Sequence, residues 1–181
     1  TGGAVVGIGC SNTSPAIVNS NNLVHTLSST GAAAVTGISS TGASASVNIF
    51  KNKVYGLSGS NASSTVNGML VSTGTVNIYN NYIGDLQASI ASAANPVIGL
   101  SITGGTTMNV VYNTIYLNAT SSGTIFGSSA ISVSSTPATT LGNNVLINTS
   151  TPNTTGFTVA YRRSSTTLTS YQNASNTNIL Y

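Results

Sequence analysis

Apolar and polar residues alternate along much of this chain with a spacing of two, as in strands that bury one face. Val47 and Ile49, and Val76 and Ile78, are clear examples. Valine, isoleucine, threonine and tyrosine, which favour strands, are frequent, and runs of strong helix formers are scarce. The pattern predicts an all-β protein built from short strands.

An asparagine followed two residues later by a branched apolar residue recurs along the whole chain. Its positions are separated by 30, 29, 32, 31 and 34 residues and are Asn22, Asn52, Asn81, Asn113, Asn144 and Asn178. A second motif, a small residue that opens an alternating apolar stretch, keeps nearly the same period. Its first residues are Gly7, Gly37, Gly68, Gly99, Ala130 and Gly156. Two motifs with one period identify six copies of a repeat of about 31 residues.

Each copy predicts three short strands: one after the small residue, one before the asparagine and one after it. A unit of this size cannot bury its own apolar side, so the copies must stack. Stacked coils whose equivalent strands pair form a parallel β-helix, and we expect residues 1–181 to be a single such solenoid of six coils.

The asparagine is expected at a corner between two strands of a coil. Asparagine tolerates the left-handed backbone region, and its amide can bond the same asparagine in the coils above and below. The glycine of the second motif is expected to serve another tight bend at the start of its strand.

The pattern G-Φ-x-Φ followed by V-x-I-x-N-N-x-I resembles the right-handed parallel β-helix repeats of the pectate-lyase-like superfamily, from Gly7 to Tyr181. That resemblance implies right-handed coils. The last copy, VAYRRSSTTLTSYQNASNTNILY, is similar to repeats of very large bacterial surface proteins of Bacteroidota that use type IX secretion. It implies an extracellular or cell-surface location.

Charged residues make up only 3% of the chain: four Lys and Arg residues against Asp85, for a net charge of +3. A carboxylate pair for glycoside hydrolysis and a hard-cation site each need more acidic groups, so the acidic, calcium-dependent chemistry of pectate-lyase-like enzymes is not expected. Cys10 and His25 are single and cannot build a zinc site. We therefore expect no enzyme activity and no cofactor.

Nucleic-acid binding and membrane insertion are not expected either. The basic residues form two separated pairs rather than a dense stripe. No apolar run approaches the roughly 20 residues that span a bilayer.

Lys51 and Lys53 flank Asn52 and are expected to be solvated turn residues, with a polysaccharide or phosphate contact as the alternative. Arg162 and Arg163 follow the stretch GFTVAY and are expected on a solvated edge, with an acidic partner as the alternative.

His25, Cys10 and Asp85 are each the only residue of their type, and each is expected to have a structural role. His25 takes a position that varies between copies, which is typical of the surface. Cys10 takes the apolar position held by Val133 and Val159 in later copies, and is expected to be a buried small hydrophobe. Asp85 is expected to cap a turn.

The tyrosines form two sets at equivalent positions, Phe50 with Tyr79, and Tyr55 with Tyr116 and Tyr181. Such rows stack between coils, and an aromatic row on a flat sheet can also hold sugar rings. Because Gly84 and Ile147 interrupt the second row, stacking is the favoured interpretation. The possible glycan contacts are Tyr55, Tyr79 and Tyr116.

No capping element is visible at either end, so the chain is expected to be a segment of a longer solenoid or to meet other copies through its ends. The first functional hypothesis is a structural rod or filament-forming segment of a large secreted or cell-surface protein, of adhesin or sheath type. Its partners would be further copies or neighbouring segments of the same chain. The alternative is a polysaccharide-binding module that uses its Tyr and Asn faces. Ice binding would need a regular T-x-T ladder, which is not visible.

Overall fold

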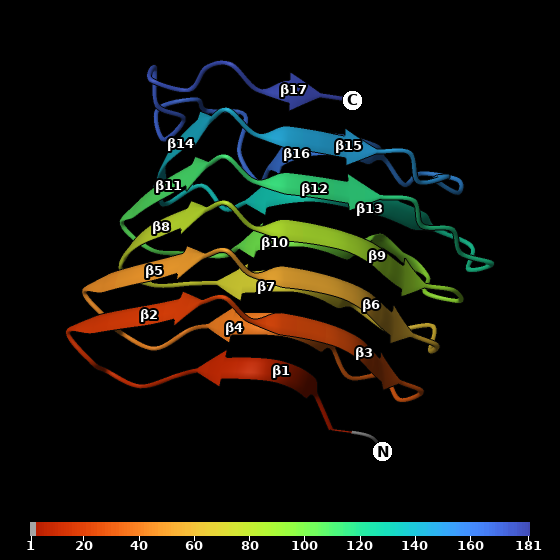
Figure 1. The fold of residues 1–181 in the computed structure, drawn as a ribbon. Coiled ribbons are helices and arrows are strands. Elements are labelled where there is room, and N and C mark those ends of the chain that lie inside the picture. Colours follow the sequence, from red (N-terminus) through yellow and green to blue (C-terminus); the bar gives the residue numbers. More distant parts are fainter. Residues whose placement is uncertain (1–2) are drawn as a thin grey trace.

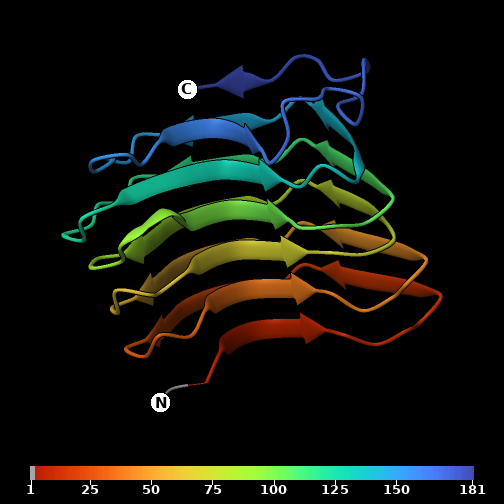
Figure 2. The same cartoon turned by 180° about the vertical axis from the view of Figure 1, so that it is seen from behind.

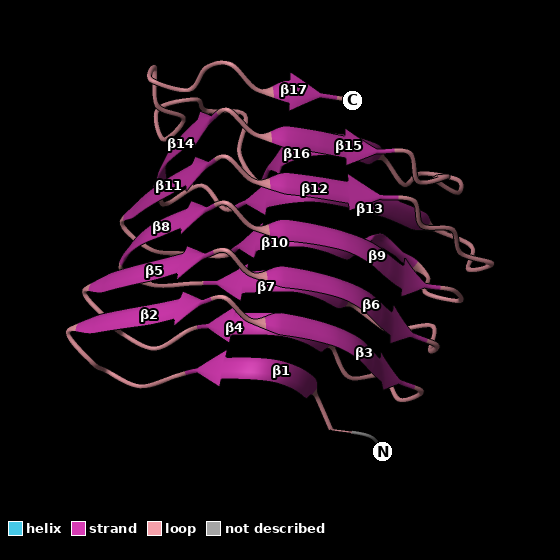
Figure 3. Cartoon of the chain, in the orientation of Figure 1, coloured by secondary structure: helices cyan, strands magenta, loops and turns pink. Residues whose placement is uncertain are grey.

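The computed structural model describes residues 3–181, and this part of the chain contains strands, turns and loops but no helix (Figure 3). The strands wind in right-handed coils that stack along one axis (Figures 1 and 2). Three parallel sheets enclose a single hydrophobic core, and equivalent strands of successive coils are neighbours in each sheet. The predicted six-coil parallel β-helix, with three strands in a coil, is confirmed.

The three sheets are named in the order in which the chain enters them. Sheet A consists of β1 (Val5–Cys10), β4 (Val35–Ser40), β7 (Val66–Val71), β10 (Ala93–Ile102), β13 (Phe126–Val133) and β16 (Thr158–Arg163). Sheet B consists of β2 (Ala16–Ser20), β5 (Ser46–Phe50), β8 (Thr75–Tyr79), β11 (Thr107–Val111) and β14 (Ala138–Gly142). Sheet C consists of β3 (Leu23–Ser29), β6 (Lys53–Gly59), β9 (Tyr82–Ala88), β12 (Thr114–Leu117), β15 (Val145–Asn148) and β17 (Ile179–Leu180).

The pairing register places equivalent residues of successive coils beside one another. Val47 of β5 lies beside Val76 of β8, which lies beside Met108 of β11, and all three side chains are buried. Each inward column therefore continues from coil to coil as an apolar ladder, and neighbouring coils are about 4.8 Å apart. The repeat of about 31 residues is the length of chain that completes one coil.

Four glycines of the second motif, Gly7, Gly37, Gly68 and Gly99, lie inside strands and do not serve a bend, so that expectation was wrong for them. Gly37 lies inside β4, and a Cβ on it would come within 2.4 Å of Val54 and 2.6 Å of the carbonyl oxygen of Gly68. Gly68, one coil on, faces the same crowding from Ile83 and the next coil. The missing side chain lets sheet A approach sheet C closely.

The sixth copy of that motif was placed four residues too early. In the β13–β16 pairing Ile131 lies beside Tyr161 and Val133 lies beside Arg163, so Gly156 precedes the strand. The column of Cys10 therefore ends in Arg163 and not in Val159. Cys10 itself is only half-buried against the core.

Sheet C has an extra residue in its first three coils. Thr26, Gly56 and Asp85 have φ values of 59°, 65° and 49°. The residues directly before and after each of them pair with the equivalent residues of the neighbouring strand. Such an insertion is a β-bulge, and it is missing from β12 and β15. Asp85 is thus a bulge residue within β9, and the expected turn cap was wrong.

Candidate functional site

The corner between sheets B and C carries the six repeat asparagines, joined by hydrogen bonds into one ladder. Asn81 is 3% exposed and shows the pattern. Its Oδ1 accepts from the backbone N–H and from the Nδ2 of Asn52, both at 3.0 Å. Its Nδ2 donates to the Ile49 carbonyl and to Asn113 Oδ1, both at 2.9 Å. The asparagine-to-asparagine bonds run without a break through Asn22, Asn52, Asn81, Asn113, Asn144 and Asn178.

The left-handed residue of the corner is not the ladder asparagine but the residue before it. Lys51, Asn80 and Tyr112 have φ values of 54°, 55° and 57°. This placement corrects the expected backbone role of the repeat asparagine. The turn directs the preceding side chain outward, while the ladder asparagine points into the stack. Each corner therefore presents one exposed side chain at the surface.

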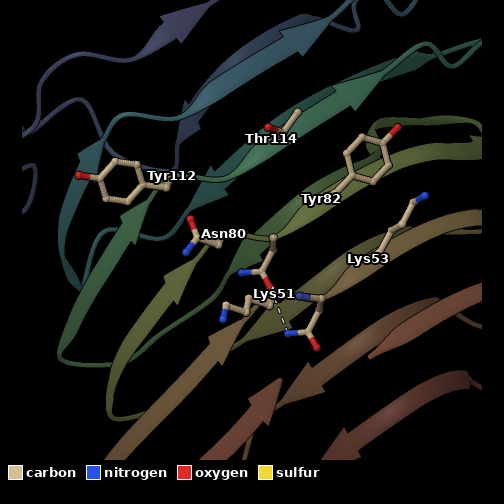
Figure 4. A pocket seen from close by; sticks show the side chains of 8 residues that line it. Lys51, Lys53, Asn80, Tyr82, Tyr112 and Thr114 are labelled. Carbon is tan, nitrogen blue, oxygen red and sulfur yellow. Dashed lines mark hydrogen bonds between the residues drawn. The ribbon is translucent and has the colours of Figure 1, made fainter. Parts of the chain in front are cut away.

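These outward side chains form one wall of a groove that runs along the axis, which we call the corner groove (Figure 4). One wall is Lys51, Asn80 and Tyr112, and the floor is Asn52 with Asn81. The opposite wall is the first residue of three successive sheet C strands, namely Lys53, Tyr82 and Thr114. The groove is shallow and open to solvent, with a volume of about 480 Å³.

The groove is cationic and aromatic. The Lys53 ammonium lies 5.1 Å from the ring centroid of Tyr55 and 5.8 Å from that of Tyr82, within range of cation–π attraction. The Tyr112 side chain is 59% exposed. The only carboxylate side chain of the protein, Asp85, lies outside the groove lining. The expected exposure of Lys51 and Lys53 is confirmed, but they share a groove with two tyrosines.

The possible glycan contacts are divided between two sheets. Tyr55 and Tyr116 stand in one column of sheet C with Gly84 between them, and Tyr79 belongs to sheet B. Gly84 does not leave a gap, because the Tyr82 ring lies over it, with its hydroxyl 2.7 Å from where a Cβ would be.

The aromatic row on sheet C therefore continues across three coils. At its lower end His25 stacks on Tyr55, with ring centroids 5.4 Å apart and the rings 9° from parallel. On sheet B, Tyr79 stacks on Phe50 at 4.7 Å and 3°. The Phe50–Tyr79 pair shows the stacking between coils that the repeat predicted, whereas Tyr55 of the second set stacks on His25 rather than on another tyrosine of its set.

Sequence reasoning did not select Asn80, Tyr82, Tyr112 and Thr114. A signal was present, because Tyr82 and Thr114 directly follow a ladder asparagine as Lys53 does. Tyr112 directly precedes one, as Lys51 does. Aligning the residues on both sides of the asparagine would have placed them together.

Residues 3–181 hold no group of three or more His, Cys, Asp or Glu side chains able to share a metal ion. No helix in that range is long and apolar enough to cross a membrane. The fold and the ladder define the chain as a parallel β-solenoid. No family model, curated protein or solved structure matches the chain in the comparisons with known proteins.

Proposed function

We propose that this chain is a non-enzymatic structural rod, a segment of a large secreted or cell-surface protein of adhesin or sheath type. The observation that carries the proposal is the unbroken asparagine ladder, which joins all six coils along the axis. Because each ladder asparagine forms hydrogen bonds with the asparagine of the next coil, neighbouring repeats are coupled. The stack of coils therefore resists bending and local opening. The similarity of the last copy to type IX-secreted repeats of Bacteroidota supports the location.

The surface composition supports the same function. With 3% charged residues, neighbouring rods repel one another weakly, and Ser, Thr and Asn side chains are available for lateral hydrogen bonds. On the outer face of sheet B, Asn77 bonds Asn48 at 2.9 Å and Asn109 bonds Asn77 at 2.9 Å. Such a regular polar face suits contact with a second rod or with a solid surface.

Electron microscopy of the purified chain, over a range of concentrations, tests self-assembly. We expect filaments or sheets with a repeat near 4.8 Å along the rod. Separate particles at every concentration would contradict self-assembly as the function. Asn77→Asp serves as the control, because a charge on the outer face of sheet B should weaken lateral contacts and leave the coils intact.

A second candidate function is polysaccharide binding, favoured by one observation, the corner groove. Tyr82 and Tyr112 offer rings for stacking on sugars, and Asn80 and Thr114 offer hydrogen-bonding groups. Lys51 and Lys53 would favour a chain that carries acidic groups.

A glycan array followed by titration calorimetry tests this candidate. We expect Tyr82→Ala to weaken binding of the best glycan and Tyr79→Ala, on the Phe50 stack outside the groove, to leave it unchanged. Equal losses in both variants would contradict binding in the groove.

A further inference from the structure

The last coil replaces apolar core residues with tyrosine and arginine. Ile131 and Val133 of β13 are buried in the core, and their neighbours in β16 are Tyr161 and Arg163. Arg162, in the same strand, lies beside Ser132. β16 is the edge strand of sheet A, visible at the top of the front sheet in Figure 2. The two arginines lie on an edge strand as expected, but both are half-buried rather than fully solvated.

A pocket of about 320 Å³ lies at this strand, and we call it the end pocket. It is lined by Phe157, Val159, Tyr161, Arg162 and Arg163. Phe157 is 65% exposed and forms an apolar wall at the surface.

Polar atoms of this pocket lack partners. Among residues 3–181, the buried side-chain nitrogen and oxygen atoms without a hydrogen-bond partner are Tyr161 Oη, Arg162 Nη1 and Arg163 Nε. All three belong to residues that line the end pocket. Buried donors almost always have an acceptor, and an unpaired guanidinium N–H is especially costly. The Tyr161 hydroxyl and the Arg163 guanidinium lie close enough to interact with each other, so Arg162 Nη1 is the group of this pocket that most lacks an acceptor.

The donors are held in place by the surrounding chain. Arg163 Nη2 donates to the Thr167 carbonyl at 2.8 Å and to Ser170 Oγ at 2.7 Å, which fixes the guanidinium and leaves Nε free. The Tyr161 ring packs against Tyr171 at 5.7 Å and 55°. Burial raises the pKa of Tyr161 above its ordinary value, while the charge of Arg163 and the hydrogen-bonding interaction of its side chain with the phenol oppose this. The phenol therefore keeps its proton at neutral pH and remains a donor.

We propose that the end pocket binds an oxyanion, a carboxylate, phosphate or sulfate group, through Arg162, Arg163 and Tyr161. Guanidinium groups recognise oxyanions through charge-assisted hydrogen bonds, and two adjacent cations without a neighbouring carboxylate need a counter-charge. Asp85, the only acidic side chain, is in β9 of sheet C and does not line the pocket. The exposed ring of Phe157 contacts the apolar part of a ligand that carries the anion.

Nuclear magnetic resonance tests the proposal directly, because Arg162 and Arg163 are the only arginines of the chain. A spectrum of ¹⁵N-labelled protein shows two arginine Nε–H signals, and loss of one in Arg162→Gln assigns them. We expect sodium phosphate, sulfate, acetate or benzoate to shift both signals in a saturable manner, and sodium chloride at equal ionic strength to leave them in place. Tighter binding of benzoate than of phosphate identifies a carboxylate on an apolar body, and the reverse identifies a phosphoryl group.

Variants separate binding from folding. Arg162→Gln and Tyr161→Phe should each weaken binding by about tenfold, since each removes one hydrogen bond to the anion. Lys51→Gln removes the same charge outside the end pocket and should not change the affinity. Absence of a saturable shift, or an equal loss of affinity in Lys51→Gln, would overturn the proposal. The rod proposal does not depend on either result.

Discussion

Asn81 Oδ1 accepts two hydrogen bonds from Asn52, one from its backbone N–H and one from its side-chain Nδ2, each at 3.0 Å. The same paired contact recurs at each step of the ladder. One side chain thus completes the backbone hydrogen bonding of a corner in the adjacent coil. The corner is held by the neighbouring coil rather than by its own turn.

The first prediction concerns this ladder. Asn81→Ala removes one acceptor and two donated bonds at a buried position, and should lower the free energy of unfolding by about 3 kcal/mol. Asn48→Ala, in the half-buried ladder on the outer face of sheet B, should cost less than about 1 kcal/mol. Urea unfolding measures both, and equal losses would contradict a larger contribution of the buried ladder than of the outer one.

The second prediction concerns the close approach of sheets A and C. Gly68→Ala places a Cβ 2.4 Å from Ile83 Cγ2 and 2.6 Å from the Gly99 carbonyl oxygen, and should destabilise the chain by about 2 kcal/mol. Gly9→Ala is the matched control, because its Cβ would have Val6 Cγ1 at 3.7 Å as the nearest atom. Thermal unfolding compares them. A similar melting temperature for both variants would show that the sheets separate easily.

The third prediction concerns the left-handed residue of the corner. Asn80 has a φ of 55°, and Asn80→Val should lower the free energy of unfolding by about 1–2 kcal/mol because a branched side chain is strained there. Asn80→Gly should be tolerated, since glycine adopts this conformation without strain. Chemical unfolding of the two variants separates backbone strain from loss of the side chain. Equal destabilisation by valine and glycine would contradict backbone strain as the cause.

The fourth prediction concerns pH. Because burial raises the folded-state pKa of Tyr161 above its value in the unfolded chain, the folded state favours the neutral phenol. This contribution to stability is fully present below the unfolded pKa, near pH 10, and is lost as the pH rises through the folded pKa.

Urea unfolding between pH 8 and pH 11 tests this sign. The free energy of unfolding should fall less steeply in Tyr161→Phe than in the unchanged chain. Tyr112→Phe, which alters an exposed ring at the corner groove, controls for the loss of a phenol. A steeper fall in Tyr161→Phe would reverse the sign and contradict the buried neutral phenol.

The repeat, the strands and the stacked core follow from the amino-acid sequence alone. The alternation of Val47 and Ile49 and the period of the asparagines are local patterns, and only a coiled stack can bury every copy of such a pattern. The composition also limits the chemistry, because a single carboxylate cannot form a catalytic pair.

Only the three-dimensional arrangement shows how the coils pack against one another. It alone also shows which side chains lie together at the surface. Gly68 resembles a turn residue in sequence, but its role depends on Ile83, a residue of another sheet. In the last coil the sequence motif starts at Gly156, whereas hydrogen bonding to β13 starts the strand later and places Tyr161 and Arg163 in the apolar columns. The corner groove and the end pocket depend on such contacts between coils, which a pattern along one coil does not specify.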